Sequence, residues 1–197
     1  MCEKKQNEEP EYLNYFSDRA KWELLTRIDS ETSRKVQAGR CPRCGGRLDV
    51  SHYPRQPRGG PDWKVRYSYC CAREGCRRRC TPESVRFLGR RVYVGFVVVL
   101  FTVMHHGVTA ARARALAEHM GVDRRTLERW RRWWLNEFVR SRCWQALRAM
   151  FAVPPKETIL PWSLYVALRE LRPDGLLATL DKLAPMTTAG WWREPAN

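Results

Sequence analysis

The chain contains CPRCGG at residues 41–46 and CAREGC at residues 71–76. Each stretch places two cysteines around a tight turn, which is how structural zinc sites collect their thiolate ligands. Gly45 and Gly75 supply the backbone freedom that such turns require. We therefore predict a zinc ribbon over residues 39–88 that holds one structural zinc ion. The predicted ligands are Cys41, Cys44, Cys71 and Cys76.

Three other side chains compete for this site. Cys70 and Cys71 are adjacent in a predicted strand and should point to opposite faces, so only one of them can ligate the metal. Cys80 would form a second turn with Cys76 that lacks a glycine, and His52 is a further candidate ligand. The alternative to a metal site is a cluster of buried, reduced thiols. Eight cysteines without a visible secretory signal favour metal ligation over disulfides.

Positive charge is concentrated in the middle of the chain. The 197 residues have a formal net charge of +15; residues 36–152 carry 24 basic and 8 acidic side chains, whereas both flanks are close to neutral. Lys64 is the only lysine among those 24. The planar arginine fork pairs with phosphate and with the guanine edge, so this field predicts a nucleic-acid surface. The alternative is an arginine-rich composition that serves solubility alone.

A helix-turn-helix pattern lies within the basic segment. Ala117 is a small residue where two helices would cross, and Gly121 would occupy the sharp turn. Asp123 is a plausible N-cap for the second helix. Five apolar residues fall at core-facing positions: Leu116, Met120, Val122, Leu127 and Trp130.

The outer face of the second helix carries the predicted nucleic-acid contacts, with base edges reached from its first turns and phosphates from its later ones. These residues are Arg124, Arg125, Glu128, Arg129 and Arg132. The alternative is an ordinary helical hairpin whose arginine face is solvated. Trp130, Trp133 and Trp134 follow helical spacing, so we predict that they belong to the core rather than to a platform for single-stranded bases.

Periodicity outlines the remaining elements. We expect an amphipathic helix over residues 11–28, a polar linker over 29–39, a Pro- and Gly-rich loop over 53–62 and a strand over 65–69. Residues 90–106 contain six valines, yet their apolar side chains share a helical face, and we predict a helix. Further helices are expected at 109–120, 123–149 with a break near Ser141, 162–171 and 176–183.

These elements divide the chain into four parts: a helix and linker at 1–38, the ribbon at 39–88, a helix-turn-helix domain at 89–152 and short helices with a tail at 153–197. The predicted fold is mainly α with a small β zinc ribbon. The apolar run at residues 92–104 is shorter than the roughly 20 residues that a membrane span needs, so no membrane partner is expected.

The order of these modules resembles the DNA-binding region of bacterial insertion-sequence transposases and their accessory proteins. The resemblance covers residues 39–140 and includes GCRRRCTP at residues 75–82, an arginine-rich exit from the second knuckle. It implies sequence-specific binding of double-stranded DNA, with Arg77, Arg78 and Arg79 among the contacts. It also implies a bacterial cytoplasmic protein associated with the nucleoid. Candidate protein partners are a second copy of the chain and a transposase.

The resemblance does not imply DNA cleavage. The acidic residues after the helix-turn-helix lie on short predicted helices or loops, with no strand pattern that would hold two magnesium ions: Glu157, Glu170, Asp174, Asp181 and Glu194. We therefore name no catalytic residue. The alternatives are an RNA-binding or ribonucleoprotein subunit, a transposase or nuclease subunit with an unrecognised active site, and a structural adaptor.

Overall fold

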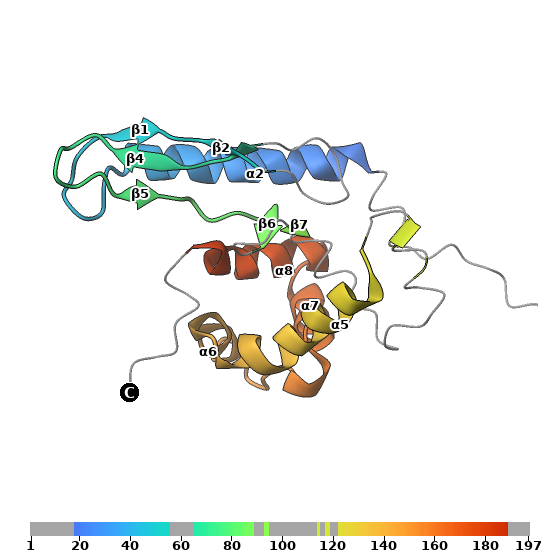
Figure 1. Cartoon of the computed structure of the whole chain (residues 1–197). Helices are drawn as coiled ribbons and strands as arrows, with labels where there is room; N and C mark the ends of the chain where they lie inside the picture. Colours follow the sequence, from blue (N-terminus) through green and yellow to red (C-terminus); the bar gives the residue numbers. More distant parts are fainter. Residues whose placement is uncertain are drawn as a thin grey trace, which may run out of the picture.

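The computed structural model describes residues 18–55, 65–88, 93–94, 114, 117–118 and 122–188. Within these residues the chain is mainly helical, with small antiparallel sheets. Figure 1 shows a long helix lying along the strands of the cysteine segment, and a second group of helices beneath them. The helical fold class with a small β component is therefore confirmed at this coarse level.

Helix α2 spans Arg19–Ala38 and is capped by Asp18, whose side chain accepts a hydrogen bond from the backbone N–H of Lys21. Its buried face contains Trp22, Leu25, Asp29 and Ser33, which lie three or four residues apart. The predicted linker over residues 29–39 is therefore wrong, because the helix continues ten residues beyond Ile28. Its buried face continues with polar residues, which hydrophobic periodicity does not detect. The predicted start near Glu11 lies outside the described residues.

Strands β1 (Leu48–Val50), β4 (Tyr69–Cys71) and β5 (Arg79–Cys80) form an antiparallel sheet in the order β1-β4-β5. Strands β2 (Tyr53–Pro54) and β3 (Val65–Arg66) pair beside it. The predicted strand over residues 65–69 is thus present as β3 and the start of β4. Tyr53 and Pro54 were expected in a loop but form β2, since β3 offers them an antiparallel partner.

Strand β6 (Phe87–Leu88) pairs with β7 (Tyr93–Val94). The helix predicted over residues 90–106 is wrong at Tyr93 and Val94, and its other residues lie outside the described part of the chain. Aromatic and β-branched residues suit a paired strand, and Phe87 and Leu88 provide the pairing that a helical pattern ignores.

The helical group begins with α5 (Arg124–Arg132), which continues through a π-helical turn, η1 (Trp133–Glu137), and a 3-10 turn, η2 (Phe138–Arg140). Ser141 then adopts an extended conformation and caps α6 (Arg142–Arg148), so the predicted break is confirmed. A 3-10 turn, η3 (Glu157–Ile159), precedes α7 (Trp162–Leu171). Helix α8 (Gly175–Leu183) and the 3-10 turn η4 (Ala184–Thr187) follow. The last two predicted helices are confirmed to within a residue.

Two hydrophobic clusters stabilise these elements. The larger joins Trp22 and Leu25 of α2 to the helical group, where Trp134 and Trp144 are fully buried. Trp130 is also buried, so the predicted core position of Trp130 and Trp134 is confirmed, while Trp133 is half-buried and packs against them. The smaller cluster lies in the cysteine segment and contains Cys41, Leu48, Tyr69, Cys71 and Cys80.

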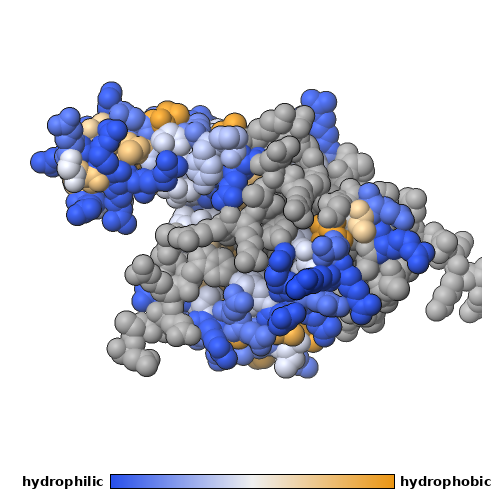
Figure 2. All heavy atoms as spheres, viewed as in Figure 1, coloured by the Kyte–Doolittle hydropathy of each residue, from blue (hydrophilic) through white to orange (hydrophobic). Residues whose placement is uncertain are grey.

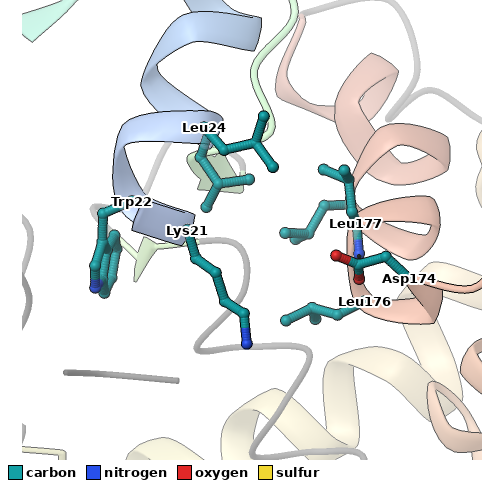
Figure 3. Close-up of a pocket in the computed structure, with 8 residues that line it drawn as sticks. Lys21, Trp22, Leu24, Asp174, Leu176 and Leu177 are labelled. Atoms are coloured by element: carbon teal, nitrogen blue, oxygen red, sulfur yellow. Dashed lines mark hydrogen bonds between the residues drawn. The ribbon is translucent and has the colours of Figure 1, made fainter. Parts of the chain in front are cut away.

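Helix α2 meets α8 across a cavity of about 30 Å³. Figure 3 shows Lys21, Trp22 and Leu24 on one side and Asp174, Leu176 and Leu177 on the other. A cavity of this volume holds a water molecule or two and no larger ligand. The cavity is therefore a small gap in the packing between the two helices.

A buried polar network joins α2 to the segment that leaves the cysteine sheet. The Asp29 carboxylate accepts hydrogen bonds from the Ser84 hydroxyl at 2.5 Å, the Val85 backbone N–H at 2.8 Å and Arg86 Nε at 2.7 Å. The side chains of Arg86 and Asp29 are only 3% and 1% exposed. A charge this deeply buried is tolerated only when it is paired and fully hydrogen-bonded, as it is here.

A second buried arginine extends the network to η4, the 3-10 turn that follows α8. Arg66 Nη2 donates to the Pro82 carbonyl at 2.6 Å and contacts Thr187 Oγ1 at 3.3 Å. The same hydroxyl oxygen accepts from the Ser84 backbone N–H at 3.0 Å. Burial lowers the pKa of Arg66. The network thus connects α2, the exit from the cysteine sheet and η4.

We predict that Asp29→Asn destabilises the protein by about 3–5 kcal/mol, because Arg86 would remain buried without its counter-charge. Urea denaturation measures this loss. The control is Glu23→Gln, which breaks an exposed pair with Arg19 and should cost less than about 1 kcal/mol. Equal denaturation midpoints for the two variants would show that the network does not stabilise the fold.

Candidate metal centre and basic surfaces

The first cysteine turn directly follows α2, which ends at Gly39. The Gly45 backbone N–H donates to the Cys41 carbonyl at 2.8 Å, and the Cys41 N–H donates to the Gly46 carbonyl at 2.9 Å. In the second turn Cys71 ends β4, and the Cys76 N–H donates to the Arg73 carbonyl at 3.1 Å. The sheet register places Leu48, which follows the first turn, opposite Cys71. The two turns therefore face each other.

The structure brings the four predicted ligands together. The sulfur atoms of Cys41, Cys44, Cys71 and Cys76 all lie within 4.8 Å of one another. Cys41 Sγ is 3.8 Å from Cys76 Sγ, and Cys44 Sγ is 3.4 Å from Cys71 Sγ. Zinc–sulfur bonds of about 2.3 Å in a tetrahedron separate the sulfur atoms by about 3.8 Å. The cluster therefore has the size and the donor set of a tetrahedral thiolate metal site.

Glycines permit this approach. Gly45 and Gly75 have φ values of 68° and 78°, as the sequence predicts for the two turns. Gly46 has a role that the spacing did not reveal: a Cβ there would lie 3.0 Å from Cys71 Sγ and 3.4 Å from Cys44 Sγ. Any larger residue at Gly46 would therefore press on the sulfur cluster.

The three competing residues lie outside the four-sulfur group. Cys70 Sγ contacts the Arg77 carbonyl at 3.4 Å and is not part of the four-sulfur group. Cys80 is buried in the same small hydrophobic cluster but is not one of the four. His52 Nδ1 contacts the Ser68 backbone, 2.9 Å from its carbonyl oxygen. Adjacent residues of a strand point to opposite faces, so Cys71 joins the four-sulfur group and Cys70 does not, as expected.

The electrostatics of the cluster favour a bound cation. The backbone N–H of Arg43 is the main cause that lowers the pKa of Cys41 to about 6, and that of Gly46 lowers the pKa of Cys44. The Arg73 N–H also lowers the pKa of Cys71, but burial and the three neighbouring cysteines outweigh it and raise that pKa to about 12. Four thiolates this close repel one another unless a metal ion compensates their charge.

Helix α5 carries the second candidate site. The Asp123 side chain accepts from the Thr126 N–H at 2.6 Å, which confirms the predicted N-cap, and this bond lowers the pKa of Asp123. Thr126, Leu127 and Trp130 are buried. The opposite face is exposed and contains the five residues of this helix that were predicted to contact nucleic acid: Arg124, Arg125, Glu128, Arg129 and Arg132.

Charge pairing divides this arginine face. Arg124 Nε lies 2.9 Å from Glu128 Oε1, and Arg129 Nη2 donates to Thr126 Oγ1 at 3.3 Å. For Arg125 and Arg132, the described residues contain no ion-pair partner. These two positive charges are therefore available to an external anion.

The exit from the second cysteine turn carries a further group of exposed arginines, Arg77, Arg78 and Arg79. Figure 2 shows hydrophilic side chains gathered over the cysteine end of the upper lobe and over the region of α5 below it. Gly121 and most of the predicted first helix of the helix-turn-helix lie outside the described part of the chain. Of residues 109–121, the structure describes 114, 117 and 118, which are helical.

Three of the acidic residues that the sequence singled out in the C-terminal part make structural contacts. Glu157 accepts from Trp144 Nε1 at 2.7 Å, Asp174 caps α8, and Asp181 lies 3.9 Å from Arg172. Within the described residues, the cysteines are the one group of three or more Cys, His, Asp or Glu that lies close enough to hold a metal.

Comparison with protein-family models, with curated proteins and with solved structures finds no match to this chain. None of the described helices combines the length and the apolar character that crossing a membrane requires. Function must therefore be inferred from the geometry and charge of the chain's own residues.

We predict that Cys71→Ser abolishes metal binding, whereas Cys70→Ser retains one metal ion per chain, because only Cys71 points into the four-sulfur group. Native mass spectrometry of protein purified without added metal measures the stoichiometry. Folding is followed in parallel by far-UV circular dichroism. One metal per chain in the Cys71 variant, or none in the wild type, would contradict the site.

Proposed function

We propose that this chain is a sequence-specific double-stranded DNA-binding protein in which a zinc ribbon stabilises one end and α5 reads the major groove. The main support is the exposed arginine face of α5. A capped N-terminus and the buried Trp130 on the opposite face hold this helix in place. A major groove about 12 Å wide admits such a helix.

The position of each arginine along α5 suggests its role. Arg125 lies in the first turn, where side chains of a recognition helix meet base edges, and its guanidinium can bond guanine in two places at once. Glu128 orients Arg124 through their ion pair. Arg129 and Arg132 follow about one and two turns after Arg125 and suit the phosphate backbone. Arg140, beyond the π-helical turn, is exposed and would contact phosphate alone.

Zinc is the metal that this site suits best. Four thiolates in two tight turns form a closed tetrahedral set, which leaves no open position for a substrate or for water. We therefore assign the metal a structural role. The small hydrophobic cluster around the cysteines contains few aliphatic side chains, so metal binding would contribute much of the folding free energy of this end.

An association with a mobile element follows from the module order that the sequence shares with transposase DNA-binding regions. The proposal favours duplex DNA over single strands or RNA, because Trp130 and Trp134 are buried and do not offer stacking surfaces. A protein that binds element ends would work in the bacterial cytoplasm, at the nucleoid, beside a transposase or a second copy of itself.

We predict tight, salt-dependent binding of duplex DNA. If about six phosphates are neutralised, the logarithm of the binding constant should fall with the logarithm of salt concentration at a slope near −5. Fluorescence anisotropy of labelled duplex, single-stranded DNA and RNA at several salt concentrations measures this. A flat salt response, or a preference for RNA, would count against the proposal.

We predict that Arg125→Ala weakens binding to the preferred site by about 1–3 kcal/mol and blurs the preference at one or two base pairs. The matched control, Arg140→Ala, should weaken all sequences alike, because a phosphate contact carries no base information. Selection from a randomised duplex library reads out both effects. Unchanged base preferences in the Arg125 variant would exclude this arginine from base reading.

A further inference from the structure

One aromatic ring near the second cysteine turn holds two arginines. The guanidinium carbons of Arg55 and Arg79 each lie 5.6 Å from the centre of the Tyr53 ring. Tyr53 belongs to β2, whereas Arg79 belongs to β5, so the group combines residues of two separate sheets. The pattern was hidden in the sequence, because the stretch around Tyr53 was expected to be an irregular loop.

The chemistry of this group favours an anion. The face of an aromatic ring attracts a guanidinium, and the Tyr53 ring brings the guanidiniums of Arg55 and Arg79 to the same place on the surface. For Arg79, the described residues offer no carboxylate as ion-pair partner. The nearby Asp49 is 3.0 Å from Arg47 and is thus engaged elsewhere.

The group is also held in place before any ligand binds. Tyr53 pairs with Arg66 in the β2–β3 ladder, and Arg66 is buried and hydrogen-bonded to the Pro82 carbonyl. Arg79 pairs with Cys70 in the sheet that carries the cysteine turns. A ring and an Arg79 backbone that are both held by strand pairing reduce the entropy lost when a ligand binds.

We propose that Arg55 and Arg79, held over Tyr53, form a phosphate clamp that grips the backbone of the same DNA duplex that α5 reads. The inference rests on the proposed function and adds a second contact to it, on the opposite lobe. The guanidinium fork matches the geometry of phosphate oxygens. Since phosphates are identical along the duplex, the clamp contributes affinity and orientation and carries no sequence preference.

The test measures anisotropy of a labelled duplex with the full chain and four variants. Arg79→Gln removes one charge of the clamp and should weaken binding about fivefold near physiological salt, with the slope of the salt dependence reduced by about 0.9. Tyr53→Ala keeps both charges but releases them, so affinity should fall while the slope stays unchanged. Tyr53→Phe keeps the ring and should behave like the wild type.

The matched control is Arg47→Gln, because Arg47 is exposed and already paired with Asp49. It should change affinity less than twofold. Circular dichroism and metal stoichiometry establish that each variant is folded. If the wild type binds duplex but Arg79→Gln and Arg47→Gln lose the same affinity, the clamp is overturned and the proposed function stands.

A second assay distinguishes DNA from an anionic lipid surface as the partner of these arginines. Vesicles of phosphatidylcholine with one-third phosphatidylserine replace the duplex in a sedimentation assay. Duplex binding that depends on Arg79, with no Arg79-dependent binding to vesicles, supports the clamp. Vesicle binding that depends on Arg79 while duplex binding does not would assign these arginines to a lipid surface and overturn it. A wild type that binds no duplex would instead contradict the proposed function itself.

Discussion

The buried carboxylate of Asp29 sets the arrangement of the whole chain. It accepts hydrogen bonds from Ser84, Val85 and Arg86, so the middle of α2 is tied to the segment that leaves the cysteine sheet. One helical turn later, the Ser33 hydroxyl lies 2.6 Å from the Tyr69 hydroxyl at the start of β4. Helix α2 therefore holds the sheet along its length and ends where the first cysteine turn begins.

The two ends of the molecule depend on different sources of stability. The helical group rests on a large apolar core with several buried tryptophans, to which Trp22 and Leu25 attach α2. The cysteine end has a cluster of only a few buried side chains and a group of four sulfur atoms that could hold a metal ion. If this group binds the proposed zinc ion, loss of the metal should loosen the cysteine end first and leave the helical core folded.

Sequence reasoning succeeded where local chemistry determines structure. Spacing and glycines predicted the four-sulfur cluster, Asp123 predicted the start of α5, and the tryptophan periodicity predicted the core. It failed where the local structure depends on a residue far away in the chain. Asp29 and Ser33 looked like linker residues because their partners, Arg86 and Tyr69, are far away in the chain. Tyr53 and Tyr93 joined strands for the same reason, since pairing depends on which segment lies alongside.

The same limit applied to the site. The arginine face of α5 could be predicted from one helix, whereas the Tyr53 group required knowledge of which strands meet. The ion pair between Arg124 and Glu128, by contrast, follows from their helical spacing of four residues, and it leaves Arg125 as the first charge available to a ligand. Pairing among exposed side chains thus refines the set of candidate contacts that composition alone suggests.

The most direct measurement of the central claim is arginine footprinting, in which a dicarbonyl reagent modifies exposed guanidiniums in the free chain and in its complex with duplex DNA. Mass spectrometry then locates each modification. We expect DNA to protect Arg79 beside the cysteine turns and Arg125 and Arg132 on α5 in the same complex, while the exposed Arg169 on α7 reacts equally in both states. Equal reactivity of all these arginines with and without DNA would contradict it.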